Sequence, residues 1–177
     1  MRMTMTPRVR KLMLTAHVIS SVGFLGAVVT FLALAIAGLS SGDAQRVRGA
    51  YLAMELTTWF VIVPLCFASL LTGIVQSLGT PWGLFRHYWV LVKFLLTLFS
   101  TIALLVHTRL IDYVAGVAAA AALSSADLSG VRFQLVVASG AALLVLLVTT
   151  ALSVYKPRGV TQHGWQKQHE QRALSQP

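Results

Sequence analysis

Four long apolar stretches alternate with shorter polar segments along the chain. They cover residues 12–39, 51–76, 88–110 and 131–155. A helix needs about 20 consecutive apolar residues to cross the hydrocarbon core of a bilayer, so each stretch is long enough to do so. The pattern predicts an all-α membrane protein whose residues 12–155 form a four-transmembrane-helix bundle.

Basic and polar segments flank this predicted domain. Residues 1–11 form a short basic arm, and residues 156–177 form a polar tail that we expect to be disordered. Lysine and arginine gather on the cytoplasmic side of membrane proteins. One side would hold Arg2, Arg8, Arg10, Lys11, Arg86, Lys156, Arg158, Lys167 and Arg172, and the other Arg46, Arg48, Arg109 and Arg132. We therefore expect both termini in the cytoplasm (N-in and C-in) and a multi-pass protein of the cell inner (plasma) membrane.

The third apolar stretch contains a lysine, Lys93. A charged side chain in hydrocarbon costs at least about 2.5 kcal/mol, so Lys93 must face the bundle interior, a water cavity or a ligand unless it snorkels to the interface. The same arc of a helical wheel holds Trp89, Thr97, Ser100, Thr101 and His107. These residues predict a polar face that is turned away from lipid.

The second stretch carries a polar stripe of its own. Glu55, Thr58, Trp59, Cys66, Ser69, Gly73, Gln76 and Ser77 lie within about 100° of one another on the wheel. Pro64 falls on the opposite side, where its missing N–H predicts a kink near the middle of the membrane.

The connections between the stretches carry two further predictions. Residues 40–50 are polar, which favours a flexible loop. Residues 111–130 are rich in alanine and favour a short helix that lies along the membrane surface and ends near Ser124 and Ser125.

The turn between the second and third stretches determines which of their polar residues share a depth, because residues equally far from it lie level. Two polar layers are predicted, an inner one of His17, Gln76 and Lys93 and an outer one of Glu55 and His107.

Several roles remain open for these side chains. His17 is a candidate for a hydrogen bond to a neighbouring helix, for a haem or metal ligand, or for a proton relay. Glu55 and His107 are candidates for an ion pair at the outer rim. A depth difference of about 15–20 Å excludes one haem held by both His17 and His107. A haem on His17 would be five-coordinate or use another ligand, with His87 as the nearest candidate.

Composition narrows the class of protein. Hydrophobic residues make up 56% of the chain and charged residues 11%, and the mean hydropathy is +0.76, which excludes an ordinary soluble domain. The net charge is +9, but the basic residues lie beside apolar stretches, so we expect lipid and not nucleic acid as their partner. A single cysteine, Cys66, excludes a Cys-x-x-Cys pair, and we expect no metal site. The sequence assigns no catalytic residue.

Short motifs resemble those of known membrane families. Residues 17–27, HVISSVGFLGA, resemble the opening of CopD-like domains, and the order Trp89, Lys93 and His107 is similar to the third helix of the HemJ type of protoporphyrinogen oxidase. The LLTG of residues 70–73 and the VYKPRG of residues 154–159 resemble a family of small four-helix membrane proteins of unknown function. The resemblance implies a four-helix bundle with a haem b or copper-linked role, in which His17 would ligate haem and Lys93 would contact a propionate or a substrate carboxylate.

Three functional hypotheses follow. The first is an accessory or structural membrane protein, not an enzyme, whose polar interior holds together the bundle, a second copy of the chain or another membrane partner. The alternative is a haem b-binding redox protein that uses His17 and Lys93. If the chain is an enzyme, it would then be a haem-dependent membrane oxidoreductase. The third is a small proton-coupled permease.

Overall fold

The computed structural model describes residues 5–79, 87–120, 128–155, 159, 161 and 165–166. Its long elements are α1 (Pro7–Ser40), α2 (Ala44–Thr57), the π-helix η1 (Thr58–Ile62), α3 (Val63–Gly79), α4 (Tyr88–Ala119) and α5 (Ser129–Tyr155). The elements α2, η1 and α3 follow one another without interruption, as one long helix (Ala44–Gly79). The described ranges thus contain four helices that are long and apolar enough to cross a membrane, which confirms the prediction of an all-helical protein with four helices that could span a membrane.

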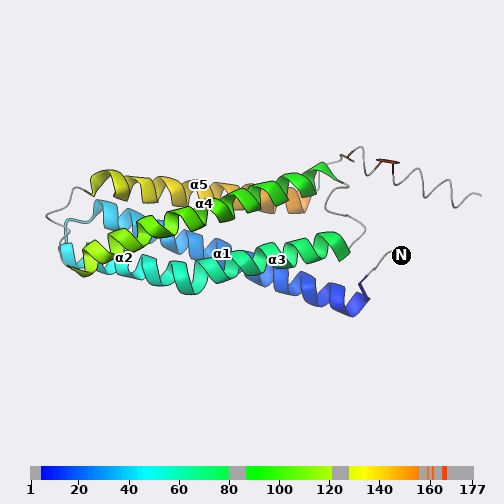
Figure 1. Ribbon diagram of the computed structural model, residues 1–177, viewed down its shortest axis with the longest axis horizontal. Helices are drawn as coiled ribbons and strands as arrows, with labels where there is room; N and C mark the ends of the chain where they lie inside the picture. The colour runs from blue at the N-terminus through cyan, green and yellow to red at the C-terminus, as the bar shows by residue number, and fades with distance from the viewer. Residues whose placement is uncertain are drawn as a thin grey trace, which may run out of the picture.

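The four long helices form an antiparallel bundle (Figure 1). Helix α1 packs against α2, α3 and α5, and α4 packs against α2 and α5. Because α1 and α4 share no comparable contact, they lie diagonally across the bundle. Helix α1 begins at the end of the bundle where α5 finishes (Figure 1).

The bundle is packed more closely at one end than at the other. Helix α4 lies closely against α2, whereas α3 and α4 separate toward the end where α1 begins (Figure 1). The buried residues of α4 lie in its second half and are Thr101, Thr108, Ile111, Val114, Ala115 and Ala118. The apolar core therefore lies mainly toward the α1–α2 turn.

The connection between α1 and α2 is shorter than the sequence suggests. The prediction of a flexible loop over residues 40–50 is wrong for most of that segment, because α2 begins at Ala44. Asp43 caps the helix, with its carboxylate accepting a hydrogen bond from the backbone N–H of Gln45 at 2.9 Å. The cap starts the helix well before the apolar stretch.

A π-helical turn occurs where the proline predicts a disturbance. The backbone N–H of Val63 bonds to the carbonyl of Thr58, five residues back. Pro64 follows directly and has no N–H to offer to the carbonyl of Phe60. Because π-turns form where the regular ladder is interrupted, the proline gives a physical reason for η1 at this position. Pro64 itself is exposed on the outside of the bundle.

Helix α4 continues beyond the predicted end of the third span. Residues 111–119 belong to α4, so the prediction of a separate surface helix is wrong for this part. Ile111, Val114 and Ala118 are buried against the bundle, and this burial extends the helix past Arg109. The predicted helix end near Ser124 and Ser125, and most of the tail over residues 156–177, lie outside the described residues.

Candidate functional site

Polar side chains join α1 to α3 in the half of the bundle where α1 begins. We call this group the α1–α3 seam, and it consists of His17, Ser21, Ser69, Thr72 and Gln76. Nδ1 of His17 lies 3.1 Å from the carbonyl oxygen of Ser69 and 3.1 Å from Oγ1 of Thr72. Because a carbonyl oxygen only accepts, Nδ1 carries the ring hydrogen and donates it to α3.

Two further bonds extend the seam on either side of His17. The hydroxyl groups of Ser21 and Ser69 lie 2.8 Å apart. One turn beyond Gly73, the side-chain amide of Gln76 donates to the carbonyl of Met13 at 2.9 Å. These bonds span about two turns of α1, from Met13 to Ser21, and place polar contacts along the part of the α1–α3 interface where α1 begins.

Gly73 explains how the His17 ring reaches the backbone of α3. A Cβ added to Gly73 would come within 3.1 Å of Cε1 of His17. A methyl group at this distance would require the ring to shift by a few tenths of an ångström, so glycine permits the closest fit, as at other close helix contacts in membranes. Gly73 belongs to the polar stripe that the sequence predicts, and its role is to admit the ring.

Lys93 lies on α4, across the bundle from His17. Its side chain is half-buried, its ammonium group donates a hydrogen bond to the hydroxyl of Ser153 on α5, and it lies 5.7 Å from the centre of the Trp89 ring. Lys93 therefore joins α4 to α5, whereas Gln76, placed with it in one predicted layer, bonds to α1.

The other polar residues predicted near Lys93 are half-buried. The hydroxyl of Thr97 bonds to the carbonyl of Lys93 at 2.8 Å, and Ser100 is half-buried. His87, just before α4, is half-buried, and its ring centre lies 6.3 Å from that of Trp89. None of these contacts brings His87 to His17.

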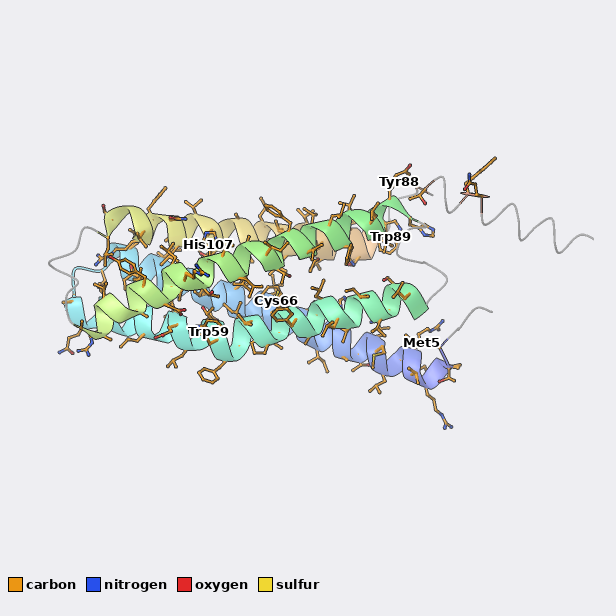
Figure 2. The ribbon with its side chains drawn as sticks, viewed as in Figure 1. Met5, Trp59, Cys66, Tyr88, Trp89 and His107 are labelled. Atoms are coloured by element: carbon orange, nitrogen blue, oxygen red, sulfur yellow. The ribbon has the colours of Figure 1, made fainter. Side chains whose placement is uncertain are left out.

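Cys66 bridges the second and third long helices at mid-depth. Its sulfur lies 3.3 Å from Oγ1 of Thr101, and both residues are buried. Figure 2 shows Cys66 between the level of Trp59 and His107 and the opposite end with Trp89. The thiol is therefore part of the helix packing.

The outer pair predicted from the sequence is not formed. Figure 2 shows Trp59, one turn after Glu55, at a level similar to that of His107, as the predicted outer layer requires. Glu55 and His107 are both described residues, and they make no ion pair. Nδ1 of His107 donates to the carbonyl of Ala103 at 2.8 Å, and the ring borders a groove with Gln134 of α5. The prediction of a Glu55–His107 ion pair is wrong because His107 lies on the α5 side of α4, not on the α2 side.

A different pair joins the second and third long helices at this level. The indole N–H of Trp59 donates to Oδ1 of Asp112 at 2.8 Å. Sequence analysis missed this bond because it placed Asp112 beyond the third span. The signal that could have identified it is an acidic residue only two positions past the apolar stretch of residues 88–110, at the level of an aromatic N–H.

A haem on His17 does not fit this packing. Nδ1 is directed to Ser69 and Thr72, and Nε2 would lie 3.9 Å from a Cβ on Gly73. An iron bound at Nε2 carries a macrocycle that extends to all sides, including the side occupied by α3. Haem ligation would need α1 and α3 to move apart and the bonds of His17 to break.

Metal-ligating side chains do not gather in the described ranges, where no group of three His, Cys, Asp or Glu residues could hold a metal ion. Among protein families, curated proteins and solved structures, none matches the chain. The assignment of function accordingly rests on the geometry of the residues described above.

Proposed function

We propose that the chain is an accessory or structural membrane protein whose intramembrane polar side chains hold its helices together. The observation that carries this proposal is the double contact of His17 with Ser69 and Thr72, closed by the fit of its ring against Gly73. A ring that is bonded and enclosed in this way stabilises a helix pair and has little room for a large cofactor.

The physical argument concerns what holds helices together in lipid. Acyl chains are as apolar as leucine, so close packing and hydrogen bonds between helices replace the hydrophobic driving force that acts in water. The α1–α3 seam supplies both, and the Lys93–Ser153 and Trp59–Asp112 bonds do the same for α4 with its two neighbours. Three of the four pairs of neighbouring long helices thus have a polar contact of their own, and the fourth pair, α1 with α5, packs without one of these bonds.

The proposal includes the orientation of the bundle. Both termini would lie in the cytoplasm, because the basic residues of the N-terminal arm, the second connection and the tail outnumber those on the opposite side. The half of the bundle with His17 and Lys93 would then lie on the cytoplasmic side of the membrane. The exposed apolar faces of the helices would contact lipid, a second copy of the chain or another membrane protein.

An absorption spectrum and a thermal unfolding curve together test the function. The full chain would be purified in detergent from haem-replete cells, with His17→Ala and a control, Val18→Ala, whose side chain is 49% exposed on the outside of α1. We expect no Soret band, a lower melting temperature for His17→Ala and little change for Val18→Ala. A Soret band that is lost in His17→Ala, or equal melting temperatures for the two variants, would contradict the proposal.

Cysteine labelling in intact cells tests the orientation. In a Cys66→Ser background, one cysteine would replace Arg10 before the first span or Arg46 at the start of α2. We expect a membrane-impermeant maleimide to label position 46 and not position 10. The opposite pattern would reverse the orientation.

A further inference from the structure

We infer that a shallow groove between α4 and α5 binds the phosphate group of an anionic phospholipid. The groove has a volume of about 330 Å³ and is lined by Val106, His107, Arg109, Leu110, Tyr113 and Gln134. It lies at the end of the bundle opposite the α1–α3 seam, so the inference is independent of the role proposed for His17.

The polar residues of the groove suit a phosphate. Arg109 is exposed, and within the described part of the chain it has no hydrogen-bond or ion-pair partner. A guanidinium group binds two oxygens of a phosphate at once. Tyr113 and Gln134 are also exposed and add a hydroxyl and an amide donor beside it. None of the residues that line the groove is acidic, so the groove favours an anion.

The depth of the groove matches that of lipid headgroups. Helix α4 begins at Tyr88, and α5 ends at Tyr155 at the same end of the bundle. Arg109 comes 21 residues after Tyr88 and Gln134 comes 21 residues before Tyr155, so both lie about 31 Å from that end at 1.5 Å per residue. This distance is close to the thickness of the hydrocarbon core, about 30 Å.

The surface below Arg109 explains why we commit to a lipid and not to a free phosphate ion. Phe99, Ile102 and Val106 are 73%, 54% and 65% exposed, and they continue at spacings of three and four residues to Arg109 and Tyr113. These spacings place all five on one face of α4. The face is apolar over the depth of the acyl chains and turns cationic and aromatic at the depth of the headgroup. A phospholipid has the same order of chemistry along its length.

Lipid retention measured by native mass spectrometry tests the inference. The full chain in mixed micelles would be offered phosphatidylglycerol, phosphatidylcholine with the same acyl chains, or inorganic phosphate. We expect phosphatidylglycerol to be retained in preference to phosphatidylcholine, and Arg109→Gln to lower its retention about fivefold, as expected for one arginine at a membrane surface. The matched control is Arg46→Gln, which removes an exposed arginine at the same end of the bundle but outside the groove, and which should change little.

Three outcomes would overturn the inference. Equal losses in Arg109→Gln and Arg46→Gln would indicate general attraction between charges, and equal retention of the two lipids would exclude a headgroup site. Binding of inorganic phosphate that depends on Arg109 in the absence of lipid would identify a free-ion site. If Arg109→Gln does not fold, Tyr113→Phe takes its place, because it removes only one hydroxyl from an exposed position. We expect Tyr113→Phe to lower the retention of phosphatidylglycerol less than Arg109→Gln would, and unchanged retention would count against the site.

Discussion

The imidazole ring of His17 occupies the space that a side chain on Gly73 would need, with Cε1 3.1 Å from the position of a Cβ. A histidine on α1 and a glycine on α3 are thus matched in shape, while Nδ1 of the same ring bonds to Ser69, one turn before Gly73, and to Thr72, the residue directly before it. The match brings two helix backbones close together and gives the half-buried imidazole hydrogen-bond partners at once.

The first prediction concerns this fit. Gly73→Ala should destabilise the protein by about 1–3 kcal/mol, because the new methyl group would lie 3.1 Å from Cε1 of His17 and force the ring to shift. Gly26→Ala is the control, since a Cβ at Gly26 has no neighbour within 4 Å. The control should be neutral or stabilising by up to about 1 kcal/mol, the usual gain for alanine in a helix. Thermal unfolding in detergent measures both, and equal effects would show that the ring can move aside.

A second prediction concerns Tyr51, whose side chain lies over Gly38 at the α1–α2 turn. Tyr51 is 2% exposed, and its hydroxyl has no hydrogen-bond partner among the described residues. The guanidinium carbon of Arg132 lies 5.7 Å from the centre of the Tyr51 ring, and Nε of Arg132 likewise has no partner among these residues. A buried hydroxyl without a partner costs about 1–3 kcal/mol. Tyr51→Phe should therefore leave the melting temperature unchanged or raise it. A marked fall would reveal an ordered water or another partner for the hydroxyl.

The matched change at the same contact is Gly38→Ala. A Cβ there would lie 2.7 Å from Cζ of Tyr51, so this variant should be clearly destabilised.

A third prediction concerns the bond between Trp59 and Asp112. Trp59→Phe keeps most of the ring but removes the N–H donor, and Asp112→Asn keeps an acceptor oxygen in place. We expect Trp59→Phe to destabilise the protein by about 1 kcal/mol and Asp112→Asn to have a smaller effect. If Asp112→Asn is the more harmful change, the carboxylate acts through its charge and not through this hydrogen bond.

A fourth prediction concerns the bond between Lys93 and Ser153. Ser153→Ala leaves the half-buried ammonium group without its hydroxyl acceptor on α5, so stability should fall by about 1–2 kcal/mol. The control is Thr150→Ala, because Thr150 is exposed and bonds only to the carbonyl of Leu146 in its own helix. Similar unfolding temperatures for the two variants would indicate that Lys93 reaches water or lipid headgroups without help from Ser153.

The number of long helices and the break near Pro64 could be predicted from the sequence. Hydrophobic length alone sets the four helices, and a proline that lacks its N–H disturbs any helix whatever surrounds it. Both features are local, so they do not depend on how the helices are arranged.

The partner of each polar side chain could not be predicted in the same way. A helical wheel places Lys93 and His107 on one broad face of α4, but α4 has two neighbours, and both side chains turn toward α5. Only the order of helices around the bundle decides between α2 and α5 as the partner. Asp112 was missed for a related reason, because burial of Ile111 and Val114 lengthens α4 beyond its apolar stretch.

A double-mutant cycle between His17 and Thr72 tests the central claim most directly. The stabilities of His17→Ala, Thr72→Ala and the double variant would be measured in one detergent by reversible unfolding. The structure predicts a coupling of about 0.6 kcal/mol or more, since hydrogen bonds between membrane helices average about 0.6 kcal/mol and reach about 1.7 kcal/mol. Losses that add to within about 0.3 kcal/mol would contradict the claim, since they would show that the two side chains do not act on each other.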